Sequence, residues 1–161
     1  MGPYQIYPVG VVHVNVGDDV VRLNENLEGV IEVFEEFSEA LQNIEGFSHL
    51  IIITFLDRID SNGRRVLKVR PRRALEKGVP KELVPEVGVF ACDSPSRPNP
   101  IGISIVEVLK VDGRFIHVRG IDVFDGTPVI DIKPYTPYRR IEKVNVPNWF
   151  SNITKFIGCE P

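Results

Sequence analysis

An apolar stretch, HLIIITFLDR, occupies residues 49–58. Its centre, Leu50 to Ile53, is unbroken apolar sequence, which is far shorter than the roughly 20 residues that a helix needs to cross a bilayer. Residues branched at Cβ favour extended backbone, and a short continuous apolar run is typical of a strand that is buried on both faces. We therefore expect a central strand at 49–58.

Further strands are predicted on both sides of this stretch. Residues 6–16, IYPVGVVHVNV, alternate between a face of valines and a face that carries His13 and Asn15. The pair Asp112-Gly113 is a favoured hairpin turn and predicts that a strand lies on each side of it. The other predicted strands are 29–34, 66–70, 88–92, 103–111, 114–120, 121–124 and 128–132.

Two helices are predicted. In EEFSEALQNI, residues 35–44, apolar side chains recur at the spacing of one helix face, and Gly46 is placed to end that helix. NWFSNITKF, residues 148–156, predicts a closing helix. Residues 74–86 hold two prolines and are expected to be irregular.

The composition favours a β-rich domain. The 161 residues include 23 Val and 17 Ile against 9 Leu and 3 Ala, and 13 Gly and 13 Pro supply turns. No repeat or linker divides the chain, whose length is that of one domain. We predict a mainly β (α+β) fold, a small β-barrel or folded mixed sheet with one or two peripheral helices. This single domain would span 1–161, with a core at about 9–138 and a C-terminal extension at 139–161.

Charge is distributed unevenly along the chain. The net charge of −3 excludes a generally basic protein that coats nucleic acid, so any such contact has to come from a local patch. Residues 63–78 hold seven basic residues and one acidic one. Within them, Lys68, Arg70 and Arg72 alternate with apolar residues, which on a strand would place three cations on one face. This face is either a solvated strand edge or a ridge that contacts phosphates.

Missing motifs exclude several classes of site. No two glycines are spaced two apart, so the Gly-rich dinucleotide turn is absent, as are the P-loop, the HExxH motif and the GxSxG elbow. The two cysteines, Cys92 and Cys159, form no CxxC, which argues against a zinc site or a disulfide framework. We expect no metal. The start, MGPYQIYPVG, lacks the features of a signal peptide, and we expect a cytoplasmic protein that does not contact membranes.

Two stiff corners are candidates for a ligand site. In DSPSRPNPIG, residues 93–102, three prolines within six residues fix the backbone around Arg97 and Asn99. The second corner is FDGTP at 124–128, followed by DIKPY at 131–135. Each corner also suits a purely structural turn between strands, and proline rigidity alone does not separate the two interpretations.

Five segments together carry a resemblance to a known family. They are GFSHL at 46–50, VRPRR at 69–73, GVFA at 88–91, RPNPIG at 97–102 and DGTPVIDIKPY at 125–135. In this order and spacing they resemble the TsaA-like family, also called TrmO, from about Val9 to Tyr138. The resemblance implies a β-barrel methyltransferase outside the Rossmann class that uses S-adenosyl-L-methionine. Its expected reaction is methylation of N6 of threonylcarbamoyladenosine, the modified base just 3′ of the anticodon in tRNA, by a homodimer.

The resemblance also implies where the cofactor would bind. The contacts would come from the end of the central strand and from the two corners: Asp57, Arg58, Asp93, Arg97, Asn99, Gly102, Ile103, Asp125, Gly126, Thr127 and Pro128. The chain departs from the family pattern at Asp57-Arg58, where relatives often carry His-Gln, and at Asp93, where they usually carry Arg.

The proposed chemistry needs a proton acceptor and an RNA-binding surface. The acceptor nitrogen has to lose a proton, which Asp125 or Asp131 could take, although each carboxylate suits a structural turn equally well. Phosphates would be held by cations and an extruded base would stack on an aromatic ring. The candidate RNA-binding residues are Lys68, Arg70, Arg72, Lys133 and Tyr135, with Tyr138 as a second ring.

Two alternatives stay open at this point. The chain could be an S-adenosyl-L-methionine-dependent methyltransferase that acts on another acceptor. It could also be a diverged module that binds the cofactor or RNA without turnover.

Overall fold

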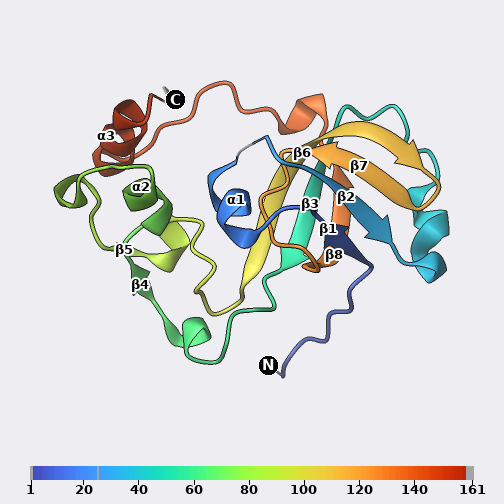
Figure 1. Ribbon diagram of the computed structural model, residues 1–161, viewed down its shortest axis with the longest axis horizontal. Coiled ribbons are helices and arrows are strands. Elements are labelled where there is room, and N and C mark those ends of the chain that lie inside the picture. Colours follow the sequence, from blue (N-terminus) through green and yellow to red (C-terminus); the bar gives the residue numbers. More distant parts are fainter. Residues whose placement is uncertain (1, 25, 159–161) are drawn as a thin grey trace. The chain divides into compact units, whose positions relative to one another are not determined.

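The computed structural model describes residues 2–24 and 26–158, and its contacts divide the chain into two compact units. The barrel unit consists of Met1–Arg58 and Pro100–Pro137, and the second unit consists of Ile59–Asn99 and Tyr138–Pro161. Figure 1 labels the elements of both. Each unit is described by itself.

The barrel unit is a closed antiparallel barrel, which confirms the mainly β fold. Its strands are β1 (Gly10–His13), β2 (Glu28–Val33), β3 (His49–Phe55), β6 (Ile101–Asp112), β7 (Phe115–Arg119) and β8 (Pro128–Pro134). They pair in the order β1-β2-β7-β6-β3-β8, and β8 closes onto β1 (Figure 1). Closure removes free strand edges, so every strand has two neighbours.

The alternation along each strand separates the inside of the barrel from its outside. On β3, Leu50, Ile52 and Thr54 point inward and are fully buried, whereas Ile51 and Ile53 are only partly buried. The expectation that this strand is buried on both faces is therefore wrong, because a barrel packs one face of each strand. The buried core is Val12, Val14, Val21, Leu27, Ile31, Val33, Leu50, Ile52, Val106, Ile116, Val118, Ile121, Val123 and Val129.

The structure corrects several predicted elements of the barrel unit. The strand expected at 6–16 covers only Gly10–His13, and residues 121–124 form no strand. The helix expected at 35–44 is a 3-10 helix, η1, at Glu35–Leu41. A short helix, α1, at Asp18–Leu23 was not predicted; it buries only Val21, and so small an apolar face leaves little periodic signal.

The second unit is a small α/β assembly with its own core. It holds β4 (Lys68–Val69), β5 (Val87–Gly88), α2 (Arg72–Glu76), α3 (Asn148–Phe156) and the 3-10 turns η2 (Gly63–Arg65), η3 (Lys81–Leu83) and η4 (Val89–Ala91). A further 3-10 turn, η5 (Pro137–Arg139), lies where the chain passes between the units. The predicted closing helix is confirmed as α3, whose Ile153 packs with Ala74, Val79 and Val84.

Two strand predictions in the second unit are wrong in extent. The strand expected at 66–70 covers only Lys68–Val69, and Pro71 then starts α2. Since Arg72 lies on that helix, Lys68, Arg70 and Arg72 do not share one strand face. The strand expected at 88–92 ends at Gly88 and continues as η4.

Among the described residues, no helix is both long and apolar enough to cross a membrane.

Candidate functional site

Four strand ends meet at one end of the barrel. Thr54, near the end of β3, pairs with Gly102 at the start of β6 on one side and with Val129 at the start of β8 on the other. The end of β1 lies beside the same start of β8, since Val11 pairs with Pro128. The turn that precedes β8 and the exit of the proline-rich loop are thus brought to the two sides of β3.

The Asp-Gly turn before β8 is locked by hydrogen bonds to β1. Gly126 N–H donates to the carbonyl of Val12 (2.9 Å), and Val12 N–H donates to the carbonyl of Thr127 (3.0 Å). Asp125 Oδ1 accepts the backbone N–H of Val14 at 3.0 Å. Gly126 has φ of +79°, a conformation that favours glycine. The turn is therefore rigid, and 58% of the Asp125 side chain remains exposed.

Arg58 ties the end of β3 to this turn. Its guanidinium donates to Asp18 Oδ2 at 2.7 Å and to the carbonyl of Asp125 at 3.0 Å. It also lies over the ring of Phe124, with 4.8 Å between Cζ and the ring centroid, and Arg22 lies over the same ring at 5.3 Å. Cations within about 6 Å of an aromatic centroid are attracted to its face. Arg58 thus links α1, β3 and the Asp-Gly turn.

Polar side chains line the inside of the same barrel end. Thr54 is fully buried, and its Oγ1 has no hydrogen-bond partner among the described residues. A Cβ placed on Gly102 would fall 2.6 Å from that oxygen, so glycine is required for β6 to approach β3. The neighbouring buried Ser104 donates its hydroxyl to Asp122.

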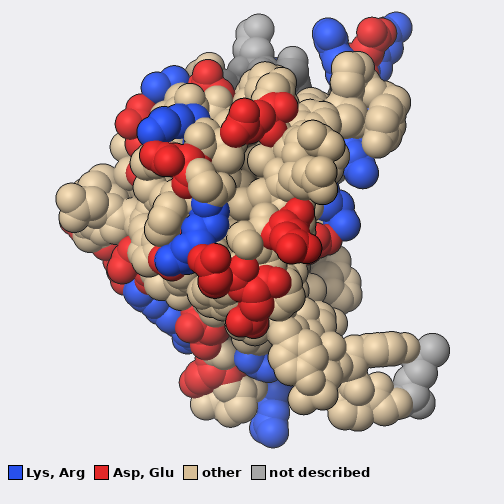
Figure 2. All heavy atoms as spheres, turned by 90° about the vertical axis from the view of Figure 1, so that its right-hand side faces the viewer, with Lys and Arg blue, Asp and Glu red and all other residues tan. Residues whose placement is uncertain are grey.

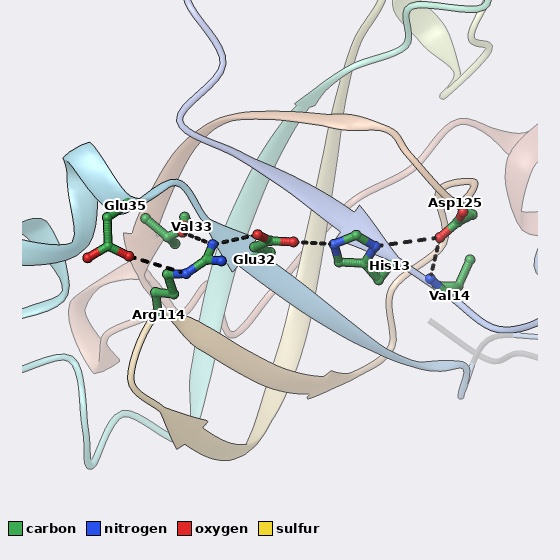
Figure 3. A network of polar contacts seen from close by, with 7 residues as sticks. All are labelled: His13, Val14, Glu32, Val33, Glu35, Arg114 and Asp125. Atoms are coloured by element: carbon green, nitrogen blue, oxygen red, sulfur yellow. Dashed lines mark hydrogen bonds and ion pairs between the residues drawn. The ribbon is translucent and has the colours of Figure 1, made fainter.

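A chain of polar contacts runs from the turn across the outside of β1 and β2. Figure 3 shows His13 between Asp125 and Glu32, with Arg114 beyond Glu32. His13 Nε2 lies 2.7 Å from Glu32 Oε2, and His13 Nδ1 lies 4.0 Å from Asp125 Oδ1. Arg114 contacts Glu32 at 2.5 Å and Glu35 at 3.4 Å. Hydrogen bonds from His13 and Arg114 hold the pKa of Glu32 below its ordinary value.

The second predicted carboxylate, Asp131, lies farther along β8. Its Oδ1 accepts the N–H of Ile132 at 2.9 Å, and its Oδ2 pairs with Lys133 Nζ at 2.5 Å. Asp131 pairs across the sheet with Ile53, beyond a bulge that separates it from the Thr54 pairing. Tyr135 follows β8 and stands edge-on to His49, with 6.4 Å between ring centroids.

The first part of the proline-rich loop belongs to the second unit. There the Arg97 guanidinium donates to the carbonyls of Ser94 (2.8 Å) and Val89 (2.7 Å) and to that of Cys92. Arg97 thus acts as an internal brace of the segment from 89 to 97, while Asp93 and Asn99 are exposed. Only Gly102 and Ile103, of the residues predicted from this loop, lie in the barrel unit.

The predicted cofactor residues therefore fall into two groups. The barrel unit brings together the end of β3, the start of β6 and the Asp-Gly turn, which carry Asp57, Arg58, Gly102, Ile103, Asp125, Gly126, Thr127 and Pro128. Asp93, Arg97 and Asn99 lie in the second unit. Sequence reasoning missed Asp18, which pairs with Arg58, and His13, which lies between Glu32 and Asp125. Their partners lie far away in the sequence, so no local pattern identifies them.

The predicted RNA-binding residues are also divided. Arg72 pairs with Glu76 at 2.7 Å, and Arg70 donates to the carbonyls of Lys81 and Val84, so Arg70 supports the fold of the second unit. Lys68 is exposed on β4. Lys133 and Tyr135 belong to the barrel unit.

Acidic and basic side chains alternate over the face that Figure 2 shows, with no broad region of one sign. Arg119 on β7 pairs with charges on both neighbouring strands, since it contacts Glu28 and Glu107 at 2.9 Å, and Lys110 contacts Asp112 on the same strand at 2.6 Å. In the described part of the chain, no three His, Cys, Asp or Glu side chains are grouped to hold a metal ion.

Comparison with known families gives one clear match. The family model of the tRNA-methyltransferase O N-terminal domain matches residues 20–139. This range includes the Asp-Gly turn, the proline-rich loop and the basic segment at 63–78.

Individual relatives agree with the family match. A probable S-adenosyl-L-methionine-binding protein of Pyrococcus abyssi is 42% identical over 135 residues, which are 81% of this chain and 67% of that protein. The tRNA (adenine(37)-N6)-methyltransferase of Mus musculus is 37% identical over 103 residues, 64% of this chain and 22% of the mouse protein. A crystal structure of TrmO superposes with a TM-score of 0.66 at 29% identity, over 89% of this chain. The match covers 64% of the crystallised TrmO chain, so the present chain spans less than two thirds of it.

Proposed function

The chain belongs to the family of the tRNA-methyltransferase O N-terminal domain, and on this premise we propose that it is an S-adenosyl-L-methionine-dependent methyltransferase that acts on tRNA. The observation that carries the proposal is the end of the barrel within the matched region, where the Asp-Gly turn, Arg58 and the start of β6 converge. The names of the Pyrococcus and mouse relatives support the cofactor and the substrate respectively.

The residues at this end of the barrel fit the cofactor by their chemistry. When bound, S-adenosyl-L-methionine supplies a methyl group on a positively charged sulfur. The exposed carboxylate of Asp125 would stabilise that positive charge. Asp57, Gly126, Thr127, Pro128 and Ile103 would complete the contacts in the barrel unit.

The finer substrate that we propose is threonylcarbamoyladenosine, methylated at N6. The loss of the N6 proton needs an acceptor, and Asp125 is the stronger candidate because Asp131 is already paired with Lys133 on the outside of β8. Lys68, Arg72, Lys133 and Tyr135 would contact the RNA. Arg70 would contribute by holding the second unit together.

We also propose an assembly, which the family resemblance implies, and a location. The enzyme would act as a homodimer and meet tRNA in the cytoplasm. The family match at 20–139 includes residues of both compact units, and we retain a single domain over 1–161 with an extension from 139 as a proposal.

Calorimetric titration with S-adenosyl-L-methionine tests the cofactor site. Arg58→Ala removes the link between β3 and the Asp-Gly turn, so we expect the affinity to fall by about tenfold, as for the loss of one charged hydrogen bond. Lys110→Ala, which removes an ion-paired cation on the β6–β7 hairpin, is the matched control and should bind like the wild type. Wild-type protein that releases no heat with S-adenosyl-L-methionine or its demethylated product would contradict the proposal.

A further inference from the structure

Phe90 is the most exposed large apolar side chain of the described residues. It lies in η4 of the second unit and is 85% exposed, whereas the preceding Val89 is 1% exposed. A single exposed apolar residue needs no explanation by itself. An exposed ring on a braced turn beside a cationic segment does need one.

One guanidinium holds the turn that carries Phe90. Arg97 donates to the carbonyl of Val89, directly before Phe90, and to that of Cys92, two residues after it. The turn is also joined to β4, because Val89 N–H donates to the carbonyl of Leu67 at 3.0 Å. The ring is therefore presented on a fixed backbone, so less conformational entropy is lost when a partner binds.

Cations from the basic segment flank this turn. Lys68 on β4 pairs with Gly88 on β5, two residues before Phe90, and its side chain is exposed. The η2 turn with Arg64 and Arg65 lies near the other end of the loop, since a Cβ on Gly63 would stand 3.7 Å from Ser96 Oγ. Proteins that bind unpaired nucleic acid combine a stacking ring with nearby cations that hold the backbone, and both kinds of residue occur in this unit.

We propose that Phe90 is a stacking platform for an unpaired base of the RNA substrate, with Lys68 and Arg65 holding the flanking phosphates. The proposal rests on the proposed function, since it takes tRNA as the substrate. It names a contact residue outside the barrel and the part of the RNA that the residue meets.

The charges on the turn favour a base rather than a phosphate at Phe90 itself. Asp93 lies on the same turn and is exposed, and its carboxylate would repel a phosphate there. The charge of the basic segment fits RNA, whose phosphates are closely spaced negative charges. A segment with seven basic residues and one acidic one, in a chain of net charge −3, is complementary to a polyanion.

Binding of an anticodon stem-loop RNA, followed by fluorescence anisotropy, tests the proposal. Phe90→Ala should weaken binding by about 5- to 100-fold, the range found when a stacking ring is removed. Phe90→Trp should retain binding, whereas Phe90→Leu, which keeps apolar area but loses the aromatic face, should behave like Phe90→Ala. Phe156→Ala removes a half-exposed ring from α3 in the same unit and should bind like the wild type.

Two further measurements separate the possible failures. Titration with S-adenosyl-L-methionine should give the same affinity for Phe90→Ala and wild type, because Phe90 is not among the predicted cofactor contacts. If the wild type binds RNA and Phe90→Ala binds it equally well, the platform is refuted and the proposed function stands. If the wild type binds no RNA, the Phe90 platform and the proposed function on tRNA both fail. If sedimentation shows that Phe90→Ala converts a dimer to a monomer, Phe90 is a subunit contact and the proposal is overturned.

Discussion

Asp125 has a structural role that one substitution can separate from its proposed role as the proton acceptor. Its Oδ1 accepts the N–H of Val14, a residue that is 8% exposed. Asp125→Asn retains an oxygen that accepts this bond, and we expect its free energy of unfolding to stay within about 0.5 kcal/mol of wild type. Asp125→Ala leaves the N–H without a partner and should cost about 1–3 kcal/mol.

Urea unfolding of both variants checks this expectation. Equal losses for the two variants would mean that the hydrogen bond to Val14 does not hold the turn. Turnover adds a second readout: full methyl transfer by Asp125→Asn would exclude this carboxylate as the proton acceptor.

Glu32 contributes to a loss of barrel stability at acid pH. Its pKa is lowered by the hydrogen bonds from His13 and then Arg114, so the unfolded chain takes up the proton before the folded one does. The contribution of Glu32 is therefore complete above its ordinary value of 4.5 and is lost as the pH falls through the lowered pKa.

Urea unfolding at a series of acid pH values should show a shallower decline for Glu32→Gln than for the wild type. Glu39→Gln, which removes one carboxylate from η1, controls for the change in net charge. Parallel curves for wild type and Glu32→Gln would show that the chain of polar contacts in Figure 3 adds nothing to stability.

At the scale of residues, the sequence indicated which residues lie together better than it indicated what each side chain contacts. Arg97 stays a predicted ligand contact, and its guanidinium also braces the turn from 89 to 97, a role that the sequence did not indicate. Arg58 and Asp125 do meet, through a backbone carbonyl rather than a carboxylate. A motif fixes which residues occur together, whereas hydrogen-bond partners depend on strand register, which no local pattern encodes.

At the scale of elements, the contact of β3 with β6 depends on Gly102. Gly102→Ala would place a methyl group 2.6 Å from Thr54 Oγ1 and 3.2 Å from Leu56 Cδ2. Because Thr54 is fully buried, we expect a loss of about 1–3 kcal/mol in the free energy of unfolding.

A double-mutant cycle with Thr54→Ala measures the contact directly. Removing the hydroxyl should make Gly102→Ala less costly by at least about 0.5 kcal/mol, the coupling expected for touching residues. Gly88→Ala is the control, since its Cβ would meet nothing closer than 3.9 Å. Additive effects in the cycle would show that the two side chains do not limit each other.

Turn chemistry predicted a hairpin correctly, whereas the helical spacing at 35–44 corresponds to a 3-10 helix. The hairpin about Asp112-Gly113 and the helix at 148–156 are both present, as β6–β7 and α3. Residues 121–124 resemble a strand because Ile121 and Val123 are buried, but Asp122 binds Ser104 and the segment joins no ladder. Burial at the end of a barrel produces the alternation of a strand without its hydrogen bonds.

At the scale of the whole molecule, RNA binding should depend on salt. The net charge is −3, so attraction to phosphates has to come from the local basic segment at 63–78. Lys68→Glu should reduce the slope of log K against log salt by about one, the value for one phosphate contact. Lys155→Glu, on α3, makes the same charge change outside that segment.

Anisotropy titrations of tRNA at several salt concentrations give these slopes. An unchanged slope for Lys68→Glu would remove the phosphate contact that we assign to β4. Arg70 is unsuitable for this test, because its guanidinium holds the carbonyls of Lys81 and Val84.

The central claim is that this barrel transfers a methyl group from S-adenosyl-L-methionine to tRNA. Mass spectrometry of the nucleosides from tRNA that carries threonylcarbamoyladenosine, incubated with the protein and the cofactor, tests it most directly. We predict that this nucleoside gains one methyl group and that Arg58→Ala slows the gain. Nucleosides of unchanged mass after incubation with folded protein that binds both cofactor and tRNA would contradict the claim.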